Sequence, residues 1–277
     1  LGELPAMRGH SGRVYALKKY VNPHASKPMG IVVEKDNLDV INESFRVLRT
    51  NLELMARRTD TGLATVAALT SLYPGSGKTF ISMNLSTALA IKGRRVLVMD
   101  MDLRRATLTE ILLGSHNHHQ GLVEYLVGMP DATPESIRVR NLNGVEGLDL
   151  LPSGIIPPNP SELLAEPKLG ELMEQLRREY DYIIFDCPPV EIVADALIVN
   201  SLVDMTLFVI RAGLFHRSQL ALIQEMYDTK RYRSLSIILN GAPDDNDGYG
   251  YGYRYGYRYG YYSRRRYGKD PDGSSGH

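Results

Sequence analysis

The chain has 277 residues, is 43% hydrophobic, and balances 32 Lys and Arg against 32 Asp and Glu. This composition suffices for one sizeable core, and the zero net charge gives no general attraction to nucleic acid. The single cysteine, Cys187, excludes a disulfide framework and fits a reducing compartment. The sequence contains no run of about 18 apolar residues that would predict a membrane span.

The amino-terminal part is expected to be irregular and then helical. Gly, Pro and Lys are scattered through residues 1–38, which predicts an arm without regular structure. Residues 39–58 are predicted to form a helix, because apolar residues recur there at a spacing near 3.6. Because the chain begins with Leu1 rather than Met, we expect it to be part of a longer protein.

From residue 65 onward, short apolar strands alternate with helical patterns. The predicted strands are 65–70, 95–99, 148–151, 182–185, 206–210 and 235–239. Helical patterns cover 79–92, a broken region up to Gly128, segments within 161–180, the stretch between the fourth and fifth strands, and 217–230. Such alternation predicts an α/β fold of the P-loop NTPase type, with a parallel sheet covered by helices on both faces.

A glycine-rich loop follows the first of these strands. It reads Pro74-Gly75-Ser76-Gly77-Lys78-Thr79, and Phe80 continues into the predicted helix. Its glycines would let backbone N–H groups surround phosphates, Lys78 would reach the β- and γ-phosphates, and Thr79 would offer a hydroxyl to Mg²⁺. The full P-loop pattern has an additional glycine where this chain has Leu72. A glycine-rich turn with a solvated lysine is the structural alternative.

Carboxylates end two other predicted strands. Asp100 and Asp102 follow one apolar run, and Asp186 ends another, before Cys187. Ligands in open α/β sheets lie at the carboxyl ends of strands, where such acids could hold Mg²⁺ or accept a proton. A turn-initiating Asp is the alternative for each acid alone, but three such features in P-loop order favour a nucleotide site.

The carboxyl-terminal segment differs from the rest of the chain. Residues 243–277 have almost no aliphatic side chains and are predicted to be disordered, which leaves 39–242 as the folded domain. Arginine interleaved with tyrosine would by itself favour single-stranded nucleic acid or simple disorder. Attached to a P-loop domain, a flexible substrate segment is the preferred interpretation. Its tyrosines are Tyr249, Tyr251, Tyr253, Tyr255, Tyr257, Tyr259, Tyr261, Tyr262 and Tyr267.

Over about residues 39–262 the chain resembles the bacterial tyrosine kinases, the cytoplasmic domains of membrane proteins that control polysaccharide export. Residues 74–79 are similar to the family's Walker A motif, which also lacks the first glycine. Asp100-x-Asp102-x-Arg104 resembles its Walker A′ motif. Asp186-Cys187-Pro188-Pro189 resembles its Walker B motif, with cysteine where threonine is usual. Residues 158–164 also resemble a family fingerprint.

Two further segments match this family. Glu43-x-x-Arg46-x-x-Arg49 resembles its oligomerisation motif, whose charges would share one helix face and pair with acids of a neighbouring subunit. A solvated charged face is the alternative. Residues 1–5 resemble the segment that follows the family's second membrane helix. The resemblance thus implies a ring-like homo-oligomer, together with the protein's own membrane-anchoring region or a membrane activator.

The resemblance also implies an activity and its residues. ATP would donate its γ-phosphate to the tail tyrosines, with Mg²⁺ held by Thr79, Asp102 and Asp186. Asp100 is the candidate proton acceptor, although Asp102 could exchange roles with it, and Asn240 is expected at the adenine base. Arg211 could face a nucleotide or a neighbouring subunit. The implied setting is the cytoplasmic face of the bacterial inner membrane, with a tyrosine phosphatase as partner and no nucleic acid.

Two other functions remain open at this point. The first is an ATPase switch of the cell-division and plasmid-partition type, a class that carries a signature lysine where this chain has Tyr73. The second is a non-catalytic module in which nucleotide binding gates assembly with a membrane partner, since a nucleotide site does not prove turnover.

Overall fold

The computed structural model describes residues 2–5, 30–56, 62–114, 119–190 and 198–242. The chain divides into two units, Leu1–Asp244 and Asp245–His277. The second unit, and with it every tyrosine of the predicted substrate tail, lies outside the described residues, as does most of the predicted amino-terminal arm.

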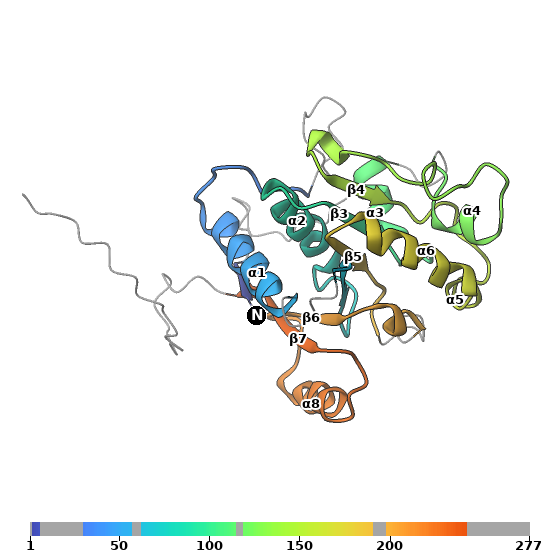
Figure 1. Cartoon of the computed structure of the whole chain (residues 1–277). Helices are drawn as coiled ribbons and strands as arrows, with labels where there is room; N and C mark the ends of the chain where they lie inside the picture. Colours follow the sequence, from blue (N-terminus) through green and yellow to red (C-terminus); the bar gives the residue numbers. More distant parts are fainter. Residues whose placement is uncertain (1, 6–29, 57–61, 115–118, 191–197, 243–277) are drawn as a thin grey trace, which may run out of the picture. The chain divides into compact units, whose positions relative to one another are not determined.

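The first unit is built on one parallel sheet, whose strands run in the order β1-β7-β6-β2-β5-β3-β4 (Figure 1). All six strand pairs are parallel. The six predicted strands are therefore confirmed, and each bound lies within three residues of the prediction. The strands are β1 (Gly2–Pro5), β2 (Thr65–Thr70), β3 (Val96–Asp100), β4 (Leu148–Leu151), β5 (Tyr182–Asp186), β6 (Met205–Arg211) and β7 (Leu235–Ala242).

The seventh strand, β1, corrects the expectation of a wholly irregular arm. It pairs in parallel with β7, with Gly2 opposite Ile238 and Leu4 opposite Asn240. A four-residue segment that contains Gly and Pro carries no strand pattern of its own, and Pro is tolerated at sheet edges. The strand is thus specified by its partner β7 rather than by its own sequence.

The described helices are α1 (Val40–Ala56), α2 (Lys78–Ile91), α3 (Thr107–Leu113), α4 (Leu122–Leu126), α5 (Pro160–Leu164), α6 (Pro167–Glu179) and α8 (Leu220–Asp228). The helical region predicted within 161–180 is divided in two. Pro160 and Pro167 each stand in the first turn of a helix, where proline's missing N–H costs nothing. The helix predicted between β5 and β6 falls largely on residues 191–197, outside the described residues.

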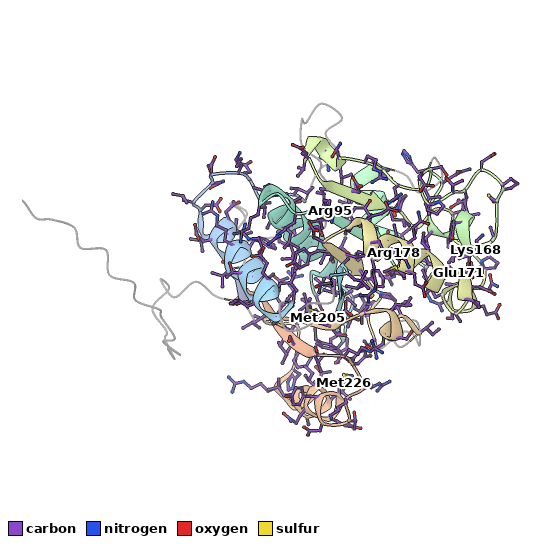
Figure 2. The ribbon with its side chains drawn as sticks, viewed as in Figure 1. Arg95, Lys168, Glu171, Arg178, Met205 and Met226 are labelled. Atoms are coloured by element: carbon purple, nitrogen blue, oxygen red, sulfur yellow. The ribbon has the colours of Figure 1, made fainter. Side chains whose placement is uncertain are left out.

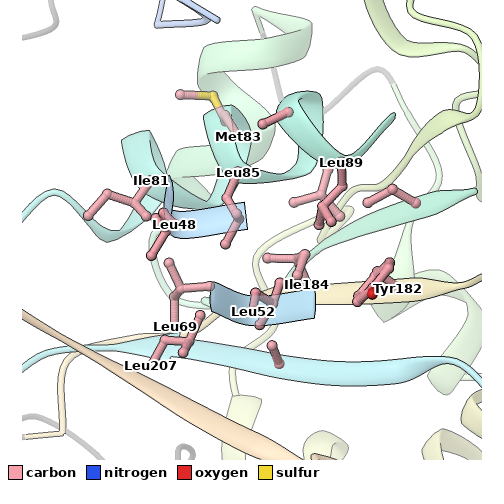
Figure 3. Packing of buried hydrophobic residues seen from close by; sticks show 14 of the residues in the cluster. Leu48, Leu52, Leu69, Ile81, Met83, Leu85, Leu89, Tyr182, Ile184 and Leu207 are labelled. Atoms are coloured by element: carbon pink, nitrogen blue, oxygen red, sulfur yellow. The ribbon is translucent and has the colours of Figure 1, made fainter. Parts of the chain in front are cut away.

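Each face of the sheet has its own core. Alternate strand residues such as Leu69, Ile184 and Leu207 pack with α1 and α2, and Figure 3 shows Leu48 and Leu52 of α1 among them. The intervening residues pack with α4, α5 and α6. This burial on both faces explains why the strands are apolar throughout, with every residue of β3, β4 and β5 buried.

Polar contacts fasten the amino-terminal edge of the sheet. Arg95, labelled in Figure 2, donates to Asp181 at 2.8 Å. The buried Tyr180 hydroxyl donates to Asp149 Oδ2 at 2.6 Å and accepts from Arg138 and Arg140. Burial, and then the bond to Asp149, raise the pKa of Tyr180 well above its usual value. This network lies at the edge opposite the carboxyl ends of the strands.

Candidate nucleotide-binding site

The loop between β2 and α2 has the backbone of a phosphate-binding turn. Gly75 and Gly77 have φ of 76° and 96°, in the left-handed region that favours glycine. A Cβ atom at Gly77 would lie 2.2 Å from Asn240 Nδ2, so the close approach of Asn240 also requires glycine there. Gly77 is the N-cap of the 14-residue helix α2, whose positive end therefore faces the loop. The predicted P-loop geometry is present.

Side chains bind the carbonyl groups of this loop. The hydroxyls of Ser71 and Ser76 both donate to the Tyr73 carbonyl, at 2.7 and 2.9 Å. Arg211 Nη1 donates to the Gly75 carbonyl at 2.7 Å, and Asn240 Nδ2 donates to the Ser76 carbonyl at 2.9 Å. The loop is thus held from β6 and β7 as well as from within.

Lys78 begins α2 and faces the acids of the neighbouring strands. Lys78 is 8% exposed, and this burial lowers the pKa of its ammonium group. The negative charges of Asp186 and Asp102 oppose that shift. Burial raises the pKa of Asp186, and hydrogen bonds from Thr79 and from Ser82, whose Oγ lies 3.2 Å from Asp186 Oδ1, offset part of this rise. The lysine and hydroxyl predicted from the P-loop therefore meet the predicted Walker B acid.

The three predicted carboxylates gather at the same edge. Asp100 ends β3 and stands opposite Asp186, which ends the adjacent strand β5. Burial and then the charge of Asp186 raise the pKa of Asp100 to about 8. Burial is the main cause that raises the pKa of Asp186 to about 6 and also raises the pKa of Asp102. Asp102 has 9% of its surface exposed, whereas Asp100 has none.

Thr109 is a site residue that the sequence analysis missed. Both its N–H and its hydroxyl donate to Asp100 Oδ2, at 2.9 and 2.7 Å, and the Ser153 N–H donates to the Thr109 hydroxyl at 3.0 Å. Thr109 lies in the first turn of α3, shortly after the Walker A′ segment. A threonine in a first helical turn behind an acidic strand end is the pattern that could have revealed it.

Oxygen donors at this edge suit magnesium. The described residues contain no group of three His, Cys, Asp or Glu placed to hold a metal by themselves. The Thr79 hydroxyl and the carboxylates of Asp102 and Asp186 would provide hard oxygen ligands beside Lys78, and Mg²⁺ at nucleotide sites takes its remaining ligands from phosphate and water. The residues present therefore fit magnesium bound together with phosphate.

The residues of the predicted oligomerisation motif make contacts within the chain. Arg46 forms an ion pair with Glu43 on α1 and donates to the Asn37 carbonyl at 2.6 Å. Arg49 Nη1 donates to the Ala88 carbonyl of α2 at 3.2 Å, and its buried Nε has no hydrogen-bond partner among the residues that the structure describes. The role of these three residues between subunits stays a prediction.

Comparisons with known proteins give the family. An AAA domain model matches residues 64–229. Tyrosine-protein kinase YwqD of Bacillus subtilis is 32% identical over 240 residues, covering 85% of this chain and 95% of YwqD. The chain belongs to the bacterial tyrosine-protein kinases. The solved kinase domain of the Escherichia coli tyrosine kinase Etk agrees, with a TM-score of 0.72 and 30% identity over 91% of this chain and 94% of that one.

Two further comparisons set the scope of this membership. The chain spans 29% of the length of full-length Etk, to which it is 33% identical over 219 residues, 79% of this chain. The septum site-determining protein MinD of Pyrococcus horikoshii, complexed with Mg-ADP, shares the fold, with a TM-score of 0.52 and 29% identity over 64% of this chain and 70% of that one. The kinases are thus the more similar group. Among the described residues, none of the helices combines the length and apolar character needed to cross a membrane.

Proposed function

We propose that this chain is an ATP-dependent protein-tyrosine kinase domain that phosphorylates the tyrosines of its own carboxyl-terminal segment, between subunits. The observation that supports this most is the meeting of Lys78 and Thr79 with Asp100, Asp102 and Asp186 at one edge of the sheet. A cation, a hydroxyl and paired carboxylates are the parts that phosphoryl transfer to a hydroxyl group needs.

Positioning and electrostatics provide most of the proposed catalysis. The loop 74–79 and Phe80 bind the nucleotide, and Lys78 neutralises charge that develops on the transferred phosphoryl group. Thr79, Asp102 and Asp186 would hold Mg²⁺, which would supply further positive charge to the phosphates. Asn240 adjoins the loop and remains the proposed contact to the adenine base.

Asp100 remains the proposed acceptor of the tyrosine proton, with Asp102 as the alternative. Two features of Asp100 bear on the choice. Its raised pKa suits a general base, but its carboxylate is fully buried and bonded to Thr109. A tyrosine hydroxyl can reach it only after those bonds rearrange, whereas Asp102 is already partly exposed. Asp100→Asn and Asp102→Asn variants, compared for ATP affinity and for the rate of transfer, separate the acceptor from the metal ligand.

The tail tyrosines from Tyr249 to Tyr267 are the proposed acceptors. Each phosphate would add about −1.5 to −2 charges, and several would reverse the charge of a basic segment. We expect this repulsion to loosen a ring of subunits assembled through Glu43, Arg46 and Arg49. Sedimentation velocity before and after incubation with Mg-ATP tests this expectation. An unchanged oligomer size would count against it.

The proposed biological setting follows from family membership. The chain would work at the cytoplasmic face of the inner membrane, joined to its own membrane-anchoring region or to a membrane activator. It would regulate polysaccharide assembly and export, and a tyrosine phosphatase would reverse its action. Loss of exported polysaccharide in cells that carry Lys78→Met at the normal protein level would support this setting.

One reaction distinguishes the kinase from the ATPase switch and from the non-catalytic module. The purified chain is incubated with γ-labelled Mg-ATP, and phosphotyrosine and free phosphate are measured in the same samples. The kinase forms phosphotyrosine. Free phosphate without phosphotyrosine would favour the ATPase switch. Tyr73 argues against that class, because it occupies the position of the class's signature lysine and its hydroxyl accepts a hydrogen bond from Gln219 of the same chain. ATP binding without either product would leave the non-catalytic module.

A further inference from the structure

Two strand ends hold two consecutive carbonyl groups of the phosphate-binding loop. Arg211 ends β6 and stands opposite Asn240 of β7 in the register of the sheet. Arg211 Nη1 donates to the Gly75 carbonyl at 2.7 Å, and Asn240 Nδ2 donates to the Ser76 carbonyl at 2.9 Å. Neighbouring residues of the sheet therefore fix neighbouring peptide groups of the loop.

These bonds determine where the N–H groups of the loop point. The described residues contain no cis peptide bond, and in a trans peptide the N–H points opposite to the carbonyl. When Arg211 and Asn240 bind the carbonyls of Gly75 and Ser76, the N–H groups of Ser76 and Gly77 point away from both side chains. Successive N–H groups directed to one side, beside glycines with positive φ, form a concave anion-binding site.

Arg211 also brings a positive charge to this loop. No ion pair joins it to an acidic residue within the described part of the chain. Its guanidinium instead donates to the neutral carbonyl of Gly75, one residue before Ser76. A cation fixed there favours the binding of negatively charged phosphates, in addition to holding the peptide group in one orientation.

We propose that Arg211 is a positioning residue of the nucleotide site, which together with Asn240 orients the Ser76 and Gly77 N–H groups toward the phosphates of ATP. This inference rests on the proposed binding of ATP and adds a residue that the P-loop motif does not contain. It requires that loss of Arg211 weaken the binding of phosphates and leave the binding of the nucleoside unchanged.

The test uses the full chain, with calorimetric titration of Mg-ADP and, separately, of adenosine. Arg211→Ala is expected to bind Mg-ADP about tenfold more weakly, as for loss of one hydrogen bond to a charged group, with adenosine affinity unchanged. Arg211→Lys should recover part of the Mg-ADP affinity, because an ammonium group can donate to the Gly75 carbonyl.

In the kinase reaction of Arg211→Ala, KM for ATP should rise more than kcat falls. Arg217→Ala, an exposed arginine in the same β6–α8 connection, is the matched control and should bind as the unchanged chain does.

Two results would overturn this inference while leaving the proposed function intact. The first is a Mg-ADP affinity that does not change in Arg211→Ala. The second is an equal loss of affinity for Mg-ADP and for adenosine together with a lower Tm, which would indicate a merely structural role. If the unchanged chain does not bind Mg-ADP, the proposed function itself fails, and this inference fails with it.

Discussion

Asp100 and Asp186 stand opposite each other at the ends of adjacent parallel strands, and both are almost completely buried. Burial raises the cost of ionising both carboxyl groups, and the charge of Asp186 raises it further for Asp100. The pKa of Asp100 accordingly rises to about 8 and that of Asp186 to about 6. The sheet therefore brings together two acids whose negative charges need a nearby cation, and Lys78 is the cation that the chain itself places beside Asp186.

The Asp100→Asn variant should become more stable relative to the unchanged chain as the pH rises. The pKa of an aspartate in the unfolded chain is about 3.9, so the folded chain binds the Asp100 proton more tightly between about pH 4 and 8. The binding of this proton therefore adds to the free energy of unfolding. This contribution is fully present below about pH 4 and is lost as the pH rises through about 8. Asparagine does not titrate. Without nucleotide or magnesium, the Tm of Asp100→Asn should be closest to that of the unchanged chain near pH 5 and exceed it by about 10 °C near pH 8.5.

Differential scanning calorimetry at both pH values checks this prediction. Asp131→Asn, which changes an exposed aspartate between α4 and β4, is the control and should follow the pH profile of the unchanged chain. A Tm difference for Asp100→Asn that does not vary with pH would show that folding does not raise the pKa of Asp100.

The Gly77→Ala variant should lose nucleotide binding while remaining folded. Its φ of 96° strains any residue with a Cβ, and that Cβ would lie 2.2 Å from Asn240 Nδ2, which must move. Gly93→Ala is a matched control, because Gly93 has φ of 85° but none of the described residues places an atom within 4 Å of a Cβ added there. Both should lose about 1–2 kcal/mol of stability. Titration with Mg-ADP should show binding for Gly93→Ala only, and equal binding by both variants would contradict the close packing of Asn240 on the loop.

The Tyr180→Phe variant should be less stable but equally active. The substitution removes a hydroxyl that donates to the buried Asp149 and accepts from Arg138 and Arg140. We expect a loss of about 1–2 kcal/mol, measured by urea unfolding, because a buried carboxylate loses one of its donors. Tyr227→Phe, on an exposed face of α8, should change stability by less than about 0.5 kcal/mol. A large loss of ATP affinity in Tyr180→Phe would show that the two edges of the sheet are coupled.

The sequence predicted the elements that have their own periodic pattern. Strands β2 and β4 have the predicted bounds because unbroken apolar runs are bordered by turns. The P-loop and the acids of β3 and β5 were found because each follows a strand end directly. Strand β1 was not predicted, since its residues become a strand only by pairing with β7.

The contacts around the site depend on tertiary proximity. Thr109 and Arg211 reach Asp100 and Gly75 across 9 and 136 residues of sequence. Thr109 lies in a recognisable local pattern, a threonine behind an acidic strand end, but nothing local to Arg211 specifies its partner. The predicted roles of Glu43, Arg46 and Arg49 depend on a second subunit in the same way. Local patterns thus indicate which residues are suited to chemistry, and the fold determines which of them meet.

Intact mass after incubation with Mg-ATP tests the kinase proposal most directly. The unchanged chain is compared with Lys78→Met and with a chain that ends at Asp247 and so lacks the tail tyrosines. The proposal predicts additions of one or more phosphoryl groups in the unchanged chain and none in either variant. Unmodified mass in the unchanged chain while ATP is consumed, or equal phosphorylation of the chain that ends at Asp247, would contradict a kinase that acts on its own tail.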